Sequence, residues 1–116
     1  MLMRQAIANL VDNAIKYTPA GGRVMLQAVQ QDGRQLISVE DSGVGIAPAD
    51  QPRLFEKFFR AHKEGEEGPR GSGLGLAIVK SIVEQHHGRV QVDSRLGKGS
   101  KFTIAFPIRQ LLAEAS

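Results

Sequence analysis

Residues 4–17, RQAIANLVDNAIKY, decide the fold, because on a helical projection they separate into two faces of different chemistry. At about 100° per residue, the apolar side chains fall within roughly one third of the circumference. These side chains are Ile7, Leu10, Val11, Ala14 and Ile15. The pattern predicts an amphipathic helix whose apolar face packs on a core.

The adjoining face of this helix carries Asn9, Asn13, Lys16 and Tyr17 within about a quarter turn. Asn is a mediocre helix former, so two of them four residues apart lower helix propensity without serving solubility. Amide oxygens can coordinate a hard cation such as Mg²⁺, and a Lys amine or Tyr hydroxyl can contact phosphate oxygens. The cluster alone leaves two interpretations open: a metal and phosphate site, or asparagines that are simply tolerated or act as caps.

Composition narrows the class of protein. A chain of 116 residues with 41% hydrophobic content can fill one core and form one domain. No run of about 18 apolar residues is present, so we expect no membrane contact by this domain. The absence of cysteine excludes disulfides and thiolate metal sites and fits a cytosolic protein. The net charge is +3 with dispersed Lys and Arg, which argues against nucleic-acid binding and suits a small polyanion.

Two hairpins are predicted. A segment rich in Val, Met and Leu at 23–30 and an alternating segment at 35–40 flank Asp32-Gly33, a strong two-residue turn signal. A second alternating pair, at 89–93 and 101–106, flanks a glycine-containing turn. We therefore expect two antiparallel strand pairs.

The segment D-S-G-V-G-I, residues 41–46, directly follows the second predicted strand. It can be a plain glycine-rich turn. Alternatively, Asp41 is presented at the end of the sheet as a hydrogen-bond acceptor, and Gly43 and Gly45 let a flat ligand approach the backbone. Both interpretations stay open at this point.

Residues 47–73 are rich in Pro, Gly and charge and have little apolar periodicity. Leu54, Phe55, Phe58 and Phe59 form a short amphipathic turn that can pin one end of this long segment. Because loops this long in small domains are usually functional or disordered, we expect a mobile lid over a ligand.

The segment G-S-G-L-G-L, residues 71–76, opens an apolar helix that continues to residue 87, with Gly88 as the expected C-terminal cap. Glycines before a helix expose backbone N–H groups at the positive end of its dipole, where phosphate can bind. Close helix packing is the other explanation. The spacing matches neither the dinucleotide nor the Walker motif. We interpret His86 and His87 at the helix end as structural, because no second pair of metal ligands is nearby.

These motifs occur in the order of the N, G1, F and G2 boxes. The chain thus resembles the catalytic ATP-binding domain of sensor histidine kinases, in the GHKL superfamily that includes DNA gyrase, Hsp90 and MutL. The resemblance covers about residues 4–107 and rests on N-L-V-D-N-A-I-K-Y-T-P, D-S-G-V-G-I, L-F-E-K-F-F-R, G-S-G-L-G-L-A-I-V-K and G-K-G-S-K-F-T-I-A-F-P. It implies an α/β two-layer sandwich, the Bergerat ATP-binding fold, with a mixed, mostly antiparallel sheet covered by helices on one face.

The resemblance also implies roles for individual residues. Asn13 and Asn9 would hold Mg²⁺, Lys16 and Tyr17 would contact phosphate, and Arg60 would reach the γ-phosphate. Asp41 would receive the adenine amino group, with Gly43 and Gly45 making room for the base. The remaining residues implied to bind ATP are Ile46, Gly71, Ser72, Gly73, Leu74, Gly75 and Leu76.

The implied activity is transfer of the ATP γ-phosphoryl group to a histidine on a separate dimerisation domain, which then supplies a response regulator. Free ATP hydrolysis should be slow, because no carboxylate stands near Asn9 where ATPases of the superfamily have Glu; Asp12 plots away from Tyr17 and is expected to face solvent. The alternatives are an anti-sigma-type serine kinase of this fold and a nucleotide-binding module without transfer activity.

The chain lacks an acceptor histidine in a helical hairpin and begins almost at the Asn-bearing helix. We therefore expect an N-terminally truncated piece of a larger kinase, forming one domain over residues 1–116. Its sheet should have an edge without a partner, and it should be able to self-associate there. ATP use implies a cytoplasmic domain, whether or not the parent kinase is anchored in a membrane.

Overall fold

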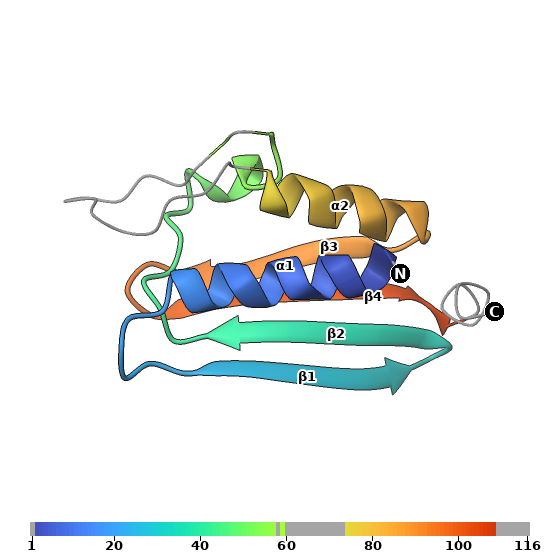
Figure 1. Cartoon of the computed structure of the whole chain (residues 1–116), viewed down its shortest axis with the longest axis horizontal. Coiled ribbons are helices and arrows are strands. Elements are labelled where there is room, and N and C mark those ends of the chain that lie inside the picture. The colour runs from blue at the N-terminus through green and yellow to red at the C-terminus, as the bar shows by residue number, and fades with distance from the viewer. Residues whose placement is uncertain (1, 58, 60–73, 109–116) are drawn as a thin grey trace.

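The computed structural model describes residues 2–57, 59 and 74–108, and in this part of the chain two helices cover one face of a four-stranded sheet (Figure 1). The sheet has the strand order β1-β2-β4-β3. The elements are α1 (Leu2–Lys16), β1 (Val24–Gln31), β2 (Arg34–Asp41), the 3₁₀ helix η1 (Gln51–Arg53), α2 (Gly75–Gln85), β3 (Arg89–Arg95) and β4 (Gly99–Pro107). The expected two-layer α/β architecture is confirmed.

The three described strand pairings are all antiparallel. The expectation of a mixed sheet is therefore met only in its antiparallel part, since the described strands include no parallel pair. Asp32 and Gly33 connect β1 to β2 with φ of 53° and 76°, the left-handed geometry that a tight hairpin turn requires. In this hairpin Ala28 lies opposite Ile37 and Leu26 lies opposite Val39.

The core lies between the helices and the sheet. On β4, the alternate residues Phe102, Ile104 and Phe106 are buried, as expected for a strand that packs helices on one face. Helices α1 and α2 pack against each other as well as on the sheet. The other buried apolar side chains are Met3, Ala6, Leu10, Ala14, Val39, Leu54, Val79, Ile82 and Val83.

The predicted apolar stripe of α1 is confirmed at its centre and wrong at its edge. Leu10 and Ala14 are buried, and Ile7 and Val11 pack against the core as partly buried residues. Ile15 is 59% exposed. It directly follows Ala14, so its side chain points about 100° further round the helix, off the face that meets the sheet.

The C-terminal end of α2 differs from the expectation in detail. The left-handed residue is His87, with φ of 62°, and the Gly88 N–H donates to the Val83 carbonyl at 2.9 Å. Gly88 is needed for another reason, because a Cβ there would overlap the Ala105 carbonyl oxygen. His86 is buried with Nδ1 2.8 Å from the Ile82 carbonyl oxygen, in keeping with a structural role.

No helix in the described part of the chain is both long enough and apolar enough to cross a bilayer.

Candidate functional site

The polar face of α1 lines a hollow of about 90 Å³ beside the start of α2. Its lining residues are Asn9, Asp12, Asn13, Lys16, Gly75 and Leu76. Five of them were expected in the site from the sequence, and the fold brings these five together from two segments about sixty residues apart.

The contact between the two helices at this hollow is made by Asn9. Its Nδ2 donates a long hydrogen bond of 3.4 Å to the Gly75 carbonyl oxygen. Leu74, directly before α2, accepts the Ile78 N–H at 2.9 Å and so begins the helix. The arrangement fixes the start of α2 beside the asparagine face.

Gly75 is not required by packing within the described structure. A Cβ at this position would meet no described atom within 4 Å, and the backbone is not in the left-handed region. Close helix packing, one of the two explanations left open by the sequence, is therefore not supported at Gly75. The backbone at the start of α2 is open to a ligand, at the end of the helix where anions are favoured.

Asp12 is a lining residue that sequence reasoning missed. It is exposed, as expected, but it also lines the hollow with Asn9 and Lys16. Its spacing from those two residues, three and four positions, was the available signal, because side chains at these spacings lie on one helical face. Its position relative to Tyr17, five residues away, does not indicate this.

Tyr17 is half-buried just beyond the end of α1 and is not among the described residues that line the hollow. Its carbonyl oxygen accepts the Val44 N–H at 3.4 Å. A Cβ on Gly43 would overlap that same oxygen. The glycine-rich segment after β2 is thus packed directly on the end of α1.

Asp41 is the last residue of β2 and is only 7% exposed. Its Oδ1 accepts the Gly43 N–H at 2.8 Å, which forms a tight turn at the end of the sheet. A buried carboxylate needs hydrogen-bond donors, and the Gly43 N–H supplies one of them to Asp41.

Ser94 anchors the segment that follows Asp41, and sequence reasoning did not identify it. The Ile46 N–H donates to Ser94 Oγ at 2.8 Å, and Gln51 Nε2 donates to the Ile46 and Ser94 carbonyls at 3.0 and 3.2 Å. Gly45, with φ of 75°, lies where a Cβ would overlap the Arg95 carbonyl. The signal was a polar residue in the inward-facing alternation of Val90, Val92 and Ser94.

The first part of the expected lid is fixed on the core. Leu54 is buried, and the ring of Phe55 meets that of Phe102 edge to face at 6.2 Å. Arg53 lies 4.6 Å from the centre of the Phe59 ring. The other residues that sequence reasoning assigned to the lid and the phosphate site, Phe58, Arg60, Gly71, Ser72 and Gly73, lie outside the described residues.

The donors at the hollow fit Mg²⁺ held together with a phosphorylated ligand. Mg²⁺ usually keeps few protein ligands, all oxygens, and takes the rest from water and phosphate. Asn9 and Asn13 supply amide oxygens, and Lys16 supplies a cation for phosphate. Among the described residues no group of three His, Cys, Asp or Glu is arranged to hold a metal ion.

The chain belongs to the family of histidine kinase-, DNA gyrase B- and HSP90-like ATPases, whose sequence profile matches residues 1–110. ATP is therefore the nucleotide of this domain type. Within the family it is a catalytic domain of the sensor histidine kinase type, as its relatives indicate. The sensor-like histidine kinase SenX3 of Mycobacterium tuberculosis is 48% identical over 106 residues, which cover 91% of this chain and 26% of SenX3. This chain thus spans about a quarter of that relative.

Solved structures of similar fold also belong to sensor histidine kinases. The mycobacterial sensor histidine kinase MprB has a TM-score of 0.79 and 38% identity, covering 89% of this chain and 70% of MprB. Full-length ShkA, solved in complex with AMPPNP, has a TM-score of 0.78 and 39% identity, covering 91% of this chain and 21% of ShkA. These neighbours favour the sensor histidine kinase type over the two alternatives, an anti-sigma-type serine kinase and a nucleotide-binding module without transfer activity.

Proposed function

We propose that this domain binds Mg²⁺-ATP between α1 and α2 and donates the γ-phosphoryl group to a histidine on a separate dimerisation domain of a longer kinase. The observation that carries the proposal is the hollow in which Asn9, Asn13 and Lys16 face the start of α2 at Gly75. The short span of this chain relative to SenX3 supports a longer parent. The phosphohistidine would then supply a response regulator.

In this proposal Asn13 and Asn9 hold Mg²⁺ and Lys16 neutralises phosphate charge. The buried carboxylate of Asp41 accepts the adenine amino group, because a charged acceptor in a low-dielectric site gives a strong, directional hydrogen bond. The pocket around the nucleotide is shaped by six further residues, Tyr17, Gly43, Gly45, Ile46, Leu74 and Leu76.

Phosphoryl transfer depends mainly on positioning and on cations around the transferred group rather than on a strong base. The polar face of α1 supplies amides and a lysine for this purpose. We further propose that residues 47–73 form the lid and that Arg60 on it contacts the γ-phosphate. Because transfer uses ATP, the domain would work on the cytoplasmic side of the membrane if its parent is anchored there.

The test is to mix the domain with a cognate histidine-bearing domain and γ-labelled ATP. Transfer of acid-labile label to the histidine is expected, together with a loss of transfer of at least about tenfold in Asn13→Ala, because that variant removes a proposed Mg²⁺ ligand. Lys80→Ala, on the exposed side of α2, is the matched control and should transfer label at the parent rate. Nucleotide binding without label on the histidine would reject the transfer and leave only a binding module.

A further inference from the structure

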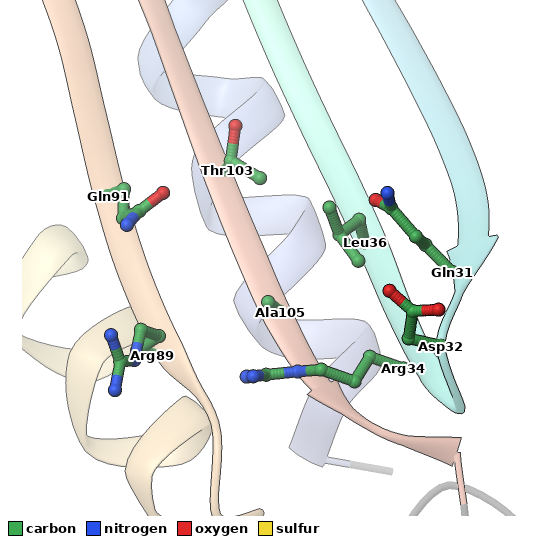
Figure 2. Close-up of a pocket in the computed structure, with 8 residues that line it drawn as sticks. All are labelled: Gln31, Asp32, Arg34, Leu36, Arg89, Gln91, Thr103 and Ala105. Atoms are coloured by element: carbon green, nitrogen blue, oxygen red, sulfur yellow. The ribbon is translucent and has the colours of Figure 1, made fainter.

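A second hollow, of about 250 Å³, lies on the face of the sheet opposite the helices (Figure 2). Its floor and walls come from β2, β3 and β4, and it shares no lining residue with the hollow between α1 and α2. The wall and floor residues are Arg34, Leu36, Arg89, Gln91, Thr103 and Ala105, with Gln31 and Asp32 at the rim.

The strand register explains why the sheet is hollowed there. Ala105 of β4 lies between Leu36 of β2 and Arg89 of β3, and Thr103 lies opposite Gln91 of β3. Short side chains on the middle strand therefore form a floor between longer side chains on the two flanking strands. The register of β2 and β4 brings Arg34 opposite Pro107, at one end of the hollow.

The Nε atom of Arg34 lacks a hydrogen-bond partner in the described part of the chain. The Arg34 side chain extends across β4 toward Arg89 on β3 (Figure 2). Its Nε is also buried. A buried donor that makes no hydrogen bond lowers the stability of the fold. The strongest hydrogen bonds of a guanidinium group are those to carboxylate or phosphate oxygens.

The charge of the hollow favours an anion. Arg34 and Arg89 bring two cations to its lining, whereas Asp32 is the single carboxylate among the described lining residues. Neither arginine forms an ion pair within the described part of the chain, where the pair of Arg53 with Glu56 is found instead. Gln91 and Thr103 add neutral donors on the floor and wall.

We propose that this hollow is a second ligand site, which binds a small free anion carrying a phosphate or carboxylate group. The guanidinium groups of Arg34 and Arg89 hold the anion oxygens, since guanidinium groups present donors in the planar geometry that these anions match. The volume is below the usual range for drug-sized ligands, so the anion has few heavy atoms. The site lies outside the proposed nucleotide pocket and does not depend on phosphoryl transfer.

The experiment is an NMR titration of the labelled domain with inorganic phosphate and, separately, with succinate, each against sodium chloride of equal ionic strength. Saturable shifts are expected for the Arg34 Nε–Hε resonance and for the amides of Leu36 and Ala105. The two arms distinguish a phosphate site from a carboxylate site. Shifts that stay linear with concentration in both arms, or that chloride reproduces, would overturn the proposal in the parent protein itself.

Variants locate the site. Arg34→Gln and Arg89→Gln should each weaken binding by at least about tenfold, followed at the Leu36 and Ala105 amides, because each removes one of the two cations. Lys80→Gln removes the same charge from the helical layer and should bind as the parent does. Equal weakening by Lys80→Gln, or displacement of the anion by a Mg²⁺-ATP analogue, would reject a separate site. Loss of nucleotide binding with anion binding intact would reject only the proposed function.

Discussion

The glycines around the site meet two different requirements. Gly43 and Gly45 are dictated by the chain itself, because a Cβ at either position would overlap a backbone carbonyl of Tyr17 or Arg95. Gly75 has free space around it and ordinary backbone geometry. A glycine that the fold does not need, at the start of a helix beside Asn9, is best explained by a ligand that approaches the backbone.

Gly75→Ala should therefore separate stability from binding. We expect the free energy of unfolding to stay equal or rise by up to about 1 kcal/mol, because Ala loses less backbone entropy in a helix than Gly. Nucleotide affinity should fall, because the new methyl group occupies the space beside the backbone. Urea denaturation and nucleotide titration measure the two effects.

Gly43→Ala is the comparison, and it should lower the free energy of unfolding by about 1–3 kcal/mol through its clash with Tyr17. A Gly75→Ala protein that is destabilised and binds nucleotide normally would contradict this distinction between the two glycines.

At the scale of elements, the segment after Asp41 is held by the β3–β4 hairpin. Ser94 Oγ accepts the Ile46 N–H and also donates to the Gly99 carbonyl oxygen at 3.1 Å, so one hydroxyl joins the loop to both strands. The Gly97 N–H donates to the Val44 carbonyl at 2.7 Å, which is a second hydrogen bond between this hairpin and the loop. The proposed adenine pocket is thus shaped by strands distant in the sequence.

Ser94→Ala should loosen this loop. The Ile46 N–H would lose its partner, at a cost of about 1–3 kcal/mol, and its amide hydrogen should exchange faster. The control is Ser38→Ala. Among the described residues the Ser38 hydroxyl contacts only the Thr103 hydroxyl, at 3.4 Å, so its removal should change the free energy of unfolding by less than about 0.5 kcal/mol. Hydrogen exchange followed by mass spectrometry tests both, and unchanged exchange at Ile46 would rule out the anchoring role.

Local signals account for what the sequence predicted well. Helical periodicity predicted α1 and the grouping of Asn9, Asn13 and Lys16, and the Asp32-Gly33 turn predicted the first hairpin. What it missed depends on tertiary contacts. The exposure of Ile15 reflects which side of α1 the sheet covers, and Ser94 is recognised only when Ile46 lies beside it.

At the scale of the whole molecule, the two edges of the described sheet differ. β3 carries Arg89, Asp93 and Arg95 along its length, and such charges discourage edge-to-edge pairing. β1, VMLQAVQQ, has no charged residue, and all eight of its residues are exposed. Leu26 is 56% and Met25 57% exposed, on opposite faces of this edge strand.

We expect this domain to self-associate through β1, because an uncharged edge with apolar side chains can pair with a second copy. The sedimentation coefficient should rise with protein concentration. Leu26→Lys should suppress the rise by placing a charge on the edge, whereas Lys80→Gln should leave it unchanged. A protein that stays monomeric at millimolar concentration would contradict the expectation.

The central claim is that a nucleotide binds with its base at Asp41 and its phosphates at the Asn9 and Asn13 face. The most direct test is calorimetry with a non-hydrolysable ATP analogue, with and without Mg²⁺, on the parent and on Asp41→Asn. Asn keeps a side-chain oxygen that can accept the Gly43 N–H, so the turn should survive while the buried charge is lost.

The account predicts binding that requires Mg²⁺ and that Asp41→Asn weakens by about 1–3 kcal/mol, the cost of impairing a buried hydrogen bond to a charged group. Equal affinity of the two proteins for the analogue, or an affinity that is the same with and without Mg²⁺, would contradict the assigned orientation of the nucleotide.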